Sequence, residues 1–333
     1  MTQLANTITY RDIKLSDVWQ ARQRIHSFVR WTPTVRSNSL SLHVSNDCSI
    51  YLKLDNLQDI GAFKVRGAAN AIQSMTDEER KNGVTTFSTG NHGLAVAYVA
   101  KRIGIRAVVC ISNDVPPAKV NKIREAGAEI KVVGHSQDDA AFHCYELSKN
   151  EGMSVIKPFD DPYVIAGQGT IGLELMENIP NINTAIVPLS GGGLISGVAL
   201  ALKSCNNNIR IIGVSMENGA AMYESIRNGK PTDVEETSTL ADSLRGGIGI
   251  DNQFTFPMVQ SLVDDIVLIP ETAIADGMKY MMKEHRMIIE GAAAIGIGAI
   301  IHNRITNIGK NAAVIVTGHN VDDAVIHDLI NKA

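Results

Sequence analysis

Two patterns of apolar residues alternate along the chain, one typical of strands and one typical of helices. From about residue 85 onward, short runs rich in Val, Ile and Ala predict strands, and stretches with the spacing of amphipathic helices lie between them. The strands are predicted at 106–111, 129–133, 183–189, 209–214, 264–269 and 311–316. The helices are predicted at 116–127, 138–150, 191–205, 273–285 and 291–303. This order predicts βαβ units, and therefore an α/β fold whose mostly parallel sheet is covered by helices on both faces.

One long segment, residues 229–253, interrupts the alternation. It reads GKPTDVEETSTLADSLRGGIGIDNQ and is polar and rich in turn residues. Loops of that length in compact domains are usually functional or ordered by a partner. We therefore expect one of these two roles for it.

Composition and charge exclude several classes of partner. The 333 residues suit two domains or one large α/β domain, and an aromatic content of 5% beside 44% hydrophobic residues predicts an aliphatic core. A net charge of -4 gives no reason to expect nucleic acid or an anionic membrane as a partner. The four cysteines show neither CxxC pairing nor zinc spacing, and no signal-peptide pattern or membrane span is apparent. We therefore expect a cytoplasmic location.

The segment VPLSGGGLISG, residues 187–197, predicts an anion site. A buried strand runs into a turn and the start of a helix, made of Ser190, Gly191, Gly192, Gly193 and Leu194. Consecutive glycines let backbone N–H groups converge, and the helix N-terminus adds the positive end of its dipole, which favours a phosphate. A tight strand-to-helix turn is the alternative, although one or two glycines would serve that purpose.

The segment FSTGNHGLAVAYVAKRIG, residues 87–104, also passes from a short strand into a helix. At the carboxyl end of the strand, where open α/β sheets bind ligands, stand Ser88, Thr89, Asn91 and His92. Any one of these residues could simply cap the helix. Four of them beside two glycines exceed what a cap requires, so the backbone N–H groups here could hold a substrate carboxylate.

The segment GAFKVRGAANAI, residues 61–72, places a lysine where a helix is expected to begin. The apolar face of that helix is formed by Val65, Ala68, Ala69, Ile72 and Met75. Lys64 then lies in the first turn, the unfavourable end for a cation. Most lysines are simply solvated. In a chain with a separate phosphate cradle, this one could instead be an amine of lowered pKa that forms a Schiff base with an aldehyde cofactor.

Together these segments resemble the motifs of the fold-type II pyridoxal-phosphate enzymes, in the branch of the serine/threonine dehydratases and serine racemase. AFKVRGA is similar to that family's S-F-K-x-R-G-A, STGNHG to its S-[SA]-G-N-H, and SGGGLISG to its G-G-G-G-[LM]-x-[SA]-G. PFDDPYVIAGQGTIGLEL and VTGHNVD also match family segments, the latter being similar to S-G-G-N-[VL]-D. The motifs stand in family order over residues 56–322, which is nearly the whole chain.

The resemblance implies a role for each matching position, with pyridoxal 5'-phosphate as the cofactor. Lys64 would hold the cofactor as an imine and transfer a proton, and Thr89 occupies the position of the opposite-face base in serine racemase. The other residues implied to bind the cofactor are Phe63, Asn91, Ser190, Gly191, Gly192, Gly193, Leu194, Glu290 and Thr317. Those implied to bind the carboxylate of a small amino-acid-like substrate are Ser88, Thr89, Asn91 and His92. Thr317 would face the pyridine nitrogen with a hydroxyl, which favours β-elimination over transamination.

The resemblance also implies a domain division and an assembly. The fold would be that of the tryptophan synthase β-like enzymes, with two three-layer domains built on parallel sheets. A large domain of residues 1–82 and 161–333 would bind the cofactor, and a small mobile domain of residues 83–160 would close over the substrate. A homodimer is expected.

Two positions depart from the family pattern. Thr89 is a bulkier hydroxyl than the residue of serine racemase, which argues against racemase activity. The family's divalent-metal site would keep Glu217 and Ala221, but Tyr223 stands where its second acid belongs. We therefore expect no metal.

The implied activity is that of a lyase that removes water from a β-hydroxy amino acid or a related compound. Segments 215–231, 239–256 and 288–299 resemble more narrowly the hydroxyectoine-utilisation dehydratases, whose substrate would be hydroxyectoine or a ring-opened derivative. A racemase or β-replacement enzyme of the same fold is the first alternative. A non-catalytic protein that binds the cofactor or another ligand is the second.

Overall fold

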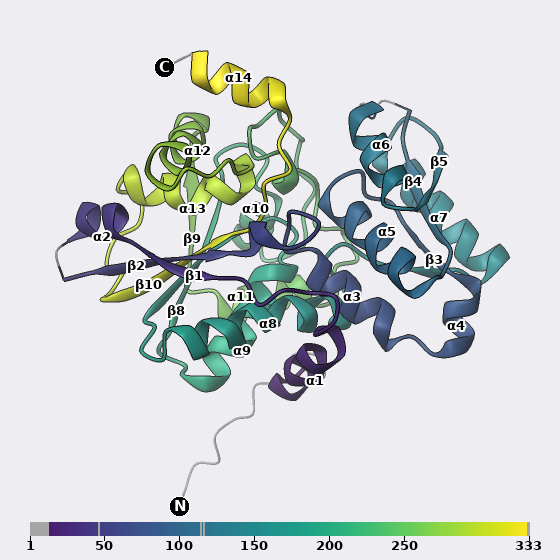
Figure 1. Cartoon of the computed structure of the whole chain (residues 1–333), viewed down its shortest axis with the longest axis horizontal. Helices are drawn as coiled ribbons and strands as arrows, with labels where there is room; N and C mark the ends of the chain where they lie inside the picture. The colour runs from purple at the N-terminus through teal and green to yellow at the C-terminus, as the bar shows by residue number, and fades with distance from the viewer. Residues whose placement is uncertain (1–12, 46, 114, 116, 332–333) are drawn as a thin grey trace, which may run out of the picture.

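The computed structural model describes residues 13–45, 47–113, 115 and 117–331 (Figure 1). Within these residues, six strands form a larger sheet in the order β1-β2-β10-β7-β8-β9. Neighbouring strands are parallel except for the antiparallel pair β1–β2 at one edge. The strands are β1 (Thr34–Ser37), β2 (Ser49–Leu54), β7 (Thr184–Pro188), β8 (Arg210–Met216), β9 (Asp265–Ile269) and β10 (Asn311–Val316).

Helices cover both faces of the larger sheet because successive side chains of its central strands point to opposite sides. Ile186 and Val314 belong to one core, which contains α2 (Asn38–Val44), α12 (Glu271–His285), α13 (Gly291–Ile301) and α14 (Asp323–Asn331). Val187 and Ile315 belong to the opposite core. Its helices are α1 (Leu15–Ile25), α8 (Pro162–Asn178), α9 (Gly193–Cys205), α10 (Ala221–Asn228) and α11 (Thr255–Leu262).

A second, parallel sheet lies beside the first, with the strand order β5-β4-β3-β6 (Figure 1). Val109 packs with α5 (Asn91–Ile103) and α6 (Pro117–Glu125), whereas Val108 packs on the other face against α7 (Gln137–Glu151). Its strands are β3 (Val84–Thr86), β4 (Ala107–Ile111), β5 (Glu129–Val132) and β6 (Ser154–Val155).

Helix α3 (Val65–Ser74) runs between the two sheets and is followed by α4 (Asp77–Asn82). Its apolar face packs with α5 in the core of the second sheet, while its glycine side meets α8. A Cβ built on Gly167 would lie 2.8 Å from the Cα of Gly67, so the two helices touch along their backbones. The residue that begins α3 therefore lies where the two sheets meet.

The α/β fold class predicted from the sequence is confirmed, and each predicted strand and helix is present with its ends within two residues of the expected positions. Segment 229–253 contains no helix or strand apart from the 3-10 turn η2 (Asp242–Leu244). No helix of the described residues combines the length and the apolar character needed to cross a membrane.

Candidate active site

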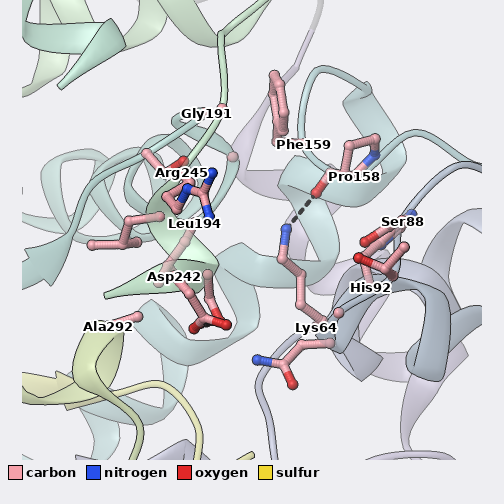
Figure 2. A pocket seen from close by; sticks show the side chains of 18 of the residues that line it. Lys64, Ser88, His92, Pro158, Phe159, Gly191, Leu194, Asp242, Arg245 and Ala292 are labelled. Carbon is pink, nitrogen blue, oxygen red and sulfur yellow. Dashed lines mark hydrogen bonds between the residues drawn. The ribbon is translucent and has the colours of Figure 1, made fainter. Parts of the chain in front are cut away.

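A cavity of about 630 Å³ opens between the two sheets, at the carboxyl ends of β3, β7 and β10. It brings together every residue that the sequence predicts for cofactor and substrate: Phe63, Lys64, Ser88, Thr89, Asn91, His92, Ser190, Gly191, Gly192, Gly193, Leu194, Glu290 and Thr317. Figure 2 shows Lys64 pointing into this space, with Gly191 and Leu194 on one side and Ser88 and His92 on the other.

Lys64 immediately precedes the first residue of α3, and its backbone is already helical, with φ -56°. Its Nζ donates a hydrogen bond to the carbonyl oxygen of Pro158 at 2.8 Å and lies 5.5 Å from the centre of the Phe63 ring. Burial lowers the pKa of Lys64 to about 8, although the charge of Glu290 opposes the shift. At that pKa about one amine in ten is uncharged at pH 7, and the uncharged form is the one that can form a Schiff base.

The glycine turn before α9 is shaped by the ring of Phe159. A Cβ on Gly191 would lie 2.4 Å from the Cδ1 of that ring, and a Cβ on Gly193 would lie 2.9 Å from the backbone carbonyl oxygen of Phe159. Gly192 has φ +88°, in the left-handed region that glycine tolerates. The turn thus brings bare backbone to the cavity at the N-terminus of a 13-residue helix, an arrangement that favours an anion.

A carboxylate is held between α13 and α5. Glu290, 2% exposed, immediately precedes α13, and both of its carboxylate oxygens accept from the Nδ2 of Asn91, at 3.1 and 3.0 Å. The Oδ1 of Asn91 accepts in turn from the Nδ2 of Asn320 at 2.8 Å. A Cβ on Gly318 would lie 2.7 Å from a Glu290 oxygen, so glycine is needed there for the acid to fit.

Thr317 lies at the end of β10 with a buried hydroxyl. Its Oγ1 has no hydrogen-bond partner within the described residues, although the residue is only 2% exposed. A buried polar atom without a partner costs about 1–3 kcal/mol. Because Thr317 also lines the cavity, a bound molecule can supply the missing partner.

Segment 88–92 forms the wall of the cavity on the side of the second sheet. Ser88 and Thr89 are half-buried, whereas His92 is buried and its Nε2 donates to the carbonyl oxygen of Ile156 at 2.9 Å. Burial, assisted by the charge of Lys64, lowers the pKa of His92 to about 3. The imidazole is therefore neutral at working pH, so it brings no positive charge to a substrate carboxylate.

Comparison with known proteins identifies the family. A sequence profile described as "Pyridoxal-phosphate dependent enzyme" matches residues 25–318. The chain belongs to this family. It is 44% identical over 331 residues to the "Putative threonine dehydratase" of Sinorhizobium fredii, covering 99% of this chain and 97% of that protein. It is 39% identical over 320 residues to the "L-threonine ammonia-lyase" of Thermotoga maritima, covering 96% and 79% respectively.

Solved structures point to the same fold. The structure of maize serine racemase superposes with a TM-score of 0.89 at 35% identity, covering 96% of this chain and 97% of that one. The processed form of threonine deaminase isoform 2 from Solanum lycopersicum superposes with a TM-score of 0.86 at 30% identity, covering 100% and 94%. The prediction of a fold-type II pyridoxal-phosphate enzyme is confirmed.

The cavity of this pyridoxal-phosphate enzyme fits its cofactor in three respects. The bare backbone of the glycine turn suits a phosphate, Lys64 offers an amine of lowered pKa, and the buried Thr317 hydroxyl lacks a partner within the described residues, which a ring nitrogen would supply. All three features line one continuous space. The individual residue roles stay predictions.

The predicted absence of a metal concerns residues outside this cavity. Glu217 lies 3.6 Å from Arg304, Ala221 begins α10, and the Tyr223 ring lies 5.8 Å from the guanidinium of Arg227. The described residues contain no cluster of three or more His, Cys, Asp or Glu side chains placed to bind a metal.

Sequence reasoning missed Asp160. Its carboxylate accepts from three backbone N–H groups at the start of α11, those of Gln253, Phe254 and Thr255, at 2.8–2.9 Å. It thereby ties the segment carrying Phe159 to a helix more than 90 residues away. The neighbouring Asp161 carries a readable signal, since an Asp before a Pro marks a helix start and it caps α8. Nothing in the sequence marks Asp160 in this way.

Segment 229–253 forms part of the cavity wall. Several of its charged side chains line the space: Asp233, Glu236, Asp242, Arg245 and Asp251. Arg245 pairs with Glu236 at 3.3 Å, and Figure 2 shows it near Leu194. The length and polarity of the segment were the signal for a functional role, but they did not reveal where it lies.

Proposed function

We propose that the protein is a pyridoxal-phosphate-dependent lyase that eliminates water from a β-hydroxy amino acid or a related compound, as a threonine or serine dehydratase does. The names of its relatives, threonine dehydratase and L-threonine ammonia-lyase, support this reaction class. The observation that carries the proposal is the buried amine of Lys64 beside an anion cradle. An amine must be uncharged to bond an aldehyde cofactor and to take a proton.

When bound, pyridoxal phosphate supplies the electron sink that makes the α-proton of the substrate acidic. The backbone of residues 190–194 would hold its phosphate, Phe63 would pack beside its ring, and the hydroxyl of Thr317 would meet its ring nitrogen. Asn91, positioned by Glu290 and Asn320, would bind the 3'-oxygen.

Lys64 would hold the cofactor and then act as the base. The free Nζ would take the α-proton of the bound substrate, and the β-hydroxyl would leave. The lost proton and hydroxide together make up water. Hydrolysis of the product then yields a 2-keto acid and ammonia.

The substrate carboxylate would bind at the N-terminus of α5. The hydroxyls of Ser88 and Thr89 and the backbone N–H groups of Asn91 and His92 are the donors proposed here. The His92 ring already donates to Ile156, so its contribution is its backbone and the fixed position of the turn.

Substrate identity is a narrower proposal. Segments 239–256 and 288–299, which resemble the hydroxyectoine-utilisation dehydratases, both contribute residues to the cavity. Hydroxyectoine or a ring-opened derivative is therefore the substrate we propose to test beside threonine and serine.

Serine racemization is the second candidate, favoured by the likeness to maize serine racemase. It needs a base on the face of the substrate opposite Lys64, and Thr89 is the residue at the matching position. An unassisted threonine hydroxyl is a poor base near neutral pH, so we expect elimination to exceed racemization.

The domain division belongs to the same proposal. Residues 83–160 would form a small domain that closes over the substrate against residues 1–82 and 161–333, and two chains would form a homodimer. The cavity between the two sheets supports closure, since its walls come from both.

The test uses the purified chain loaded with pyridoxal phosphate. We expect a visible absorption band that borohydride reduces. We also expect release of keto acid and ammonia from serine, threonine or 3-hydroxyaspartate, or loss of water from hydroxyectoine or its ring-opened derivative. Lys64→Ala should abolish both the band and the turnover. A chain with no borohydride-sensitive band would refute cofactor binding through Lys64, and a band without turnover of any of the four compounds would favour a non-catalytic binder.

A further inference from the structure

Gln168 on α8 has a buried side-chain amide that the proposed chemistry does not use. The residue is 1% exposed and lines the cavity. Its Oε1 has no hydrogen-bond partner within the described residues. A buried amide oxygen without a partner is costly, so its placement at a cavity wall calls for a partner from inside the cavity.

The position of the amide is defined by Gly67 on α3. A Cβ built on Gly67 would lie 2.4 Å from the Nε2 of Gln168 and 3.1 Å from its Cδ, so the missing side chain makes room for the amide. A Cβ on a helix tilts toward the helix N-terminus. The Gln168 amide therefore covers the first turn of α3, which begins directly after Lys64.

We propose that Gln168 is a positioning residue for Lys64: its side-chain oxygen accepts a hydrogen bond from the lysine amine whenever that amine leaves the carbonyl of Pro158. The inference rests on the proposed function, because Lys64 needs a second hydrogen-bond partner only when it reacts. The amide gives the amine a second place to bind inside the cavity. Being uncharged, it does so without the strong attraction that a carboxylate would add.

The other ionisable groups around Lys64 do not already provide this second, uncharged acceptor for its amine. On α8 itself, Glu174 is occupied by Arg66 and Lys53. The other ionisable groups that line the cavity are Glu290 before α13, His92 on α5, Lys157 and Asp160 in the segment before α8, Lys122 on α6, Tyr145 on α7, Asp322 before α14, and Asp233, Glu236, Asp242, Arg245 and Asp251 of segment 229–253. Glu290 is the one that raises the pKa of Lys64, His92 is neutral, and Asp160 is bound to the backbone of α11. A glutamate at position 168 would add a second carboxylate beside the amine.

The test measures how acetylation of Lys64 by trace acetic anhydride depends on pH, in the full-length chain before cofactor is added. Peptide mass spectrometry reads the acetylation, and the exposed lysines of the same sample serve as the reference. Gln168→Glu should raise the pKa of Lys64 by about one unit and slow its acetylation at pH 7 about tenfold. Gln168→Met keeps the volume but removes the acceptor. It should lower the pKa and speed acetylation about threefold.

Gln58→Glu is the matched control. Gln58 is also buried, at 3% exposed, but it bonds the backbone of Arg30 and does not line the cavity. We expect acetylation of Lys64 to stay within about twofold of the unmodified chain in this variant.

Unchanged acetylation in both Gln168 variants would overturn the proposal, as would an equal shift in Gln58→Glu. If Gln168→Glu does not fold, the Gln168→Met variant decides alone. Acetylation requires no turnover, so a failure of the proposed lyase activity would appear in the substrate assays and leave this result independent.

Discussion

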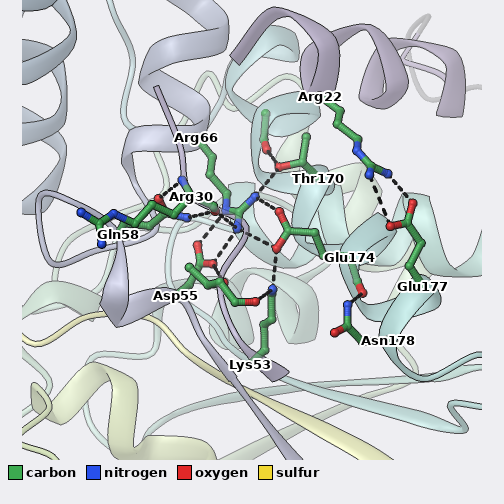
Figure 3. A network of polar contacts seen from close by, with 12 residues as sticks. Arg22, Arg30, Lys53, Asp55, Gln58, Arg66, Thr170, Glu174, Glu177 and Asn178 are labelled. Carbon is green, nitrogen blue, oxygen red and sulfur yellow. Dashed lines mark hydrogen bonds and ion pairs between the residues drawn. The ribbon is translucent and has the colours of Figure 1, made fainter. Parts of the chain in front are cut away.

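Replacement of Arg66 by methionine tests how the lysine-bearing helix is anchored. Arg66 and Asp55 are 0% exposed, and Arg66 donates to both oxygens of Asp55 at 2.8 Å and to those of Glu174 at 2.6 and 3.0 Å (Figure 3). Lys53 also pairs with Glu174, so the cluster of two acids and two bases is neutral. Without Arg66 it would hold one uncompensated buried negative charge.

The expected cost follows from that imbalance. Removing one partner of a buried ion pair destabilises proteins by about 3–5 kcal/mol, and methionine fills most of the volume without satisfying either acid. We therefore expect Arg66→Met to lower the free energy of unfolding by about 4 kcal/mol, measured by urea unfolding of the cofactor-saturated chain at neutral pH.

Arg22→Met is the matched control, because Arg22 pairs with Glu177 on the same helix, α8. Here the two side chains are 31% and 40% exposed. An exposed pair contributes about 1 kcal/mol or less, so the two variants should differ severalfold in their effect. Equal losses, or a loss below about 1 kcal/mol for Arg66→Met, would refute the view that burial decides the value of these pairs.

Three further measurements test the cavity. Thr317→Val should leave the cofactor-free chain as stable or about 1 kcal/mol more stable, because the lost hydroxyl had no partner within the described residues. Equilibrium dialysis of the same variant should show weaker cofactor binding, and unchanged binding would contradict the proposed role of Thr317. Asp160→Asn should remove about 2 kcal/mol of stability and weaken cofactor binding, since three N–H groups lose a charged acceptor; calorimetry and the same dialysis would check both. Cofactor uptake by Lys64 should rise about tenfold per pH unit toward pH 8 and then level off, because only the uncharged amine reacts and burial lowers its pKa to about 8. A stopped-flow rate that is flat between pH 6 and 8 would argue against that pKa.

The elements that the sequence predicted share one property. From residue 85 onward most strands are short, mainly apolar runs such as Ala107–Ile111, and the following helix repeats at three to four residues, so local pattern and burial agree. Strand β5 is the exception, because it reads Glu-Ile-Lys-Val and is largely exposed. Strands β1 and β2 escaped prediction. Arg36 and Lys53 interrupt them, and β1 is an antiparallel edge strand in which Val35 and Arg36 are exposed.

The same limit applies to the site. Glycines and hydroxyls beside strand ends could be read because their chemistry is local. The distant partners that position the site residues could not be predicted in this way. Asn91 bonds a glutamate 199 residues away, and Lys53 bonds one 121 residues away. In a sequence, charged residues such as Lys53 resemble surface positions, and only the fold shows that they are buried.

The first turn of α3 shows why these distant partners matter for the chemistry. Lys64 and Arg66 are two positions apart at the N-terminus of one helix, where a cation is unfavourable. Burial would lower the pKa of both, but the carboxylates of Asp55 and Glu174 outweigh it for Arg66 and raise its pKa. Lys64 has the backbone carbonyl of Pro158 as its hydrogen-bond partner and one opposing carboxylate, Glu290, so burial prevails. The fold thus pairs the charge of Arg66 with two carboxylates, whereas the charge of Lys64 is only partly compensated by Glu290. A helix start that is unfavourable for a charged lysine therefore favours an uncharged one.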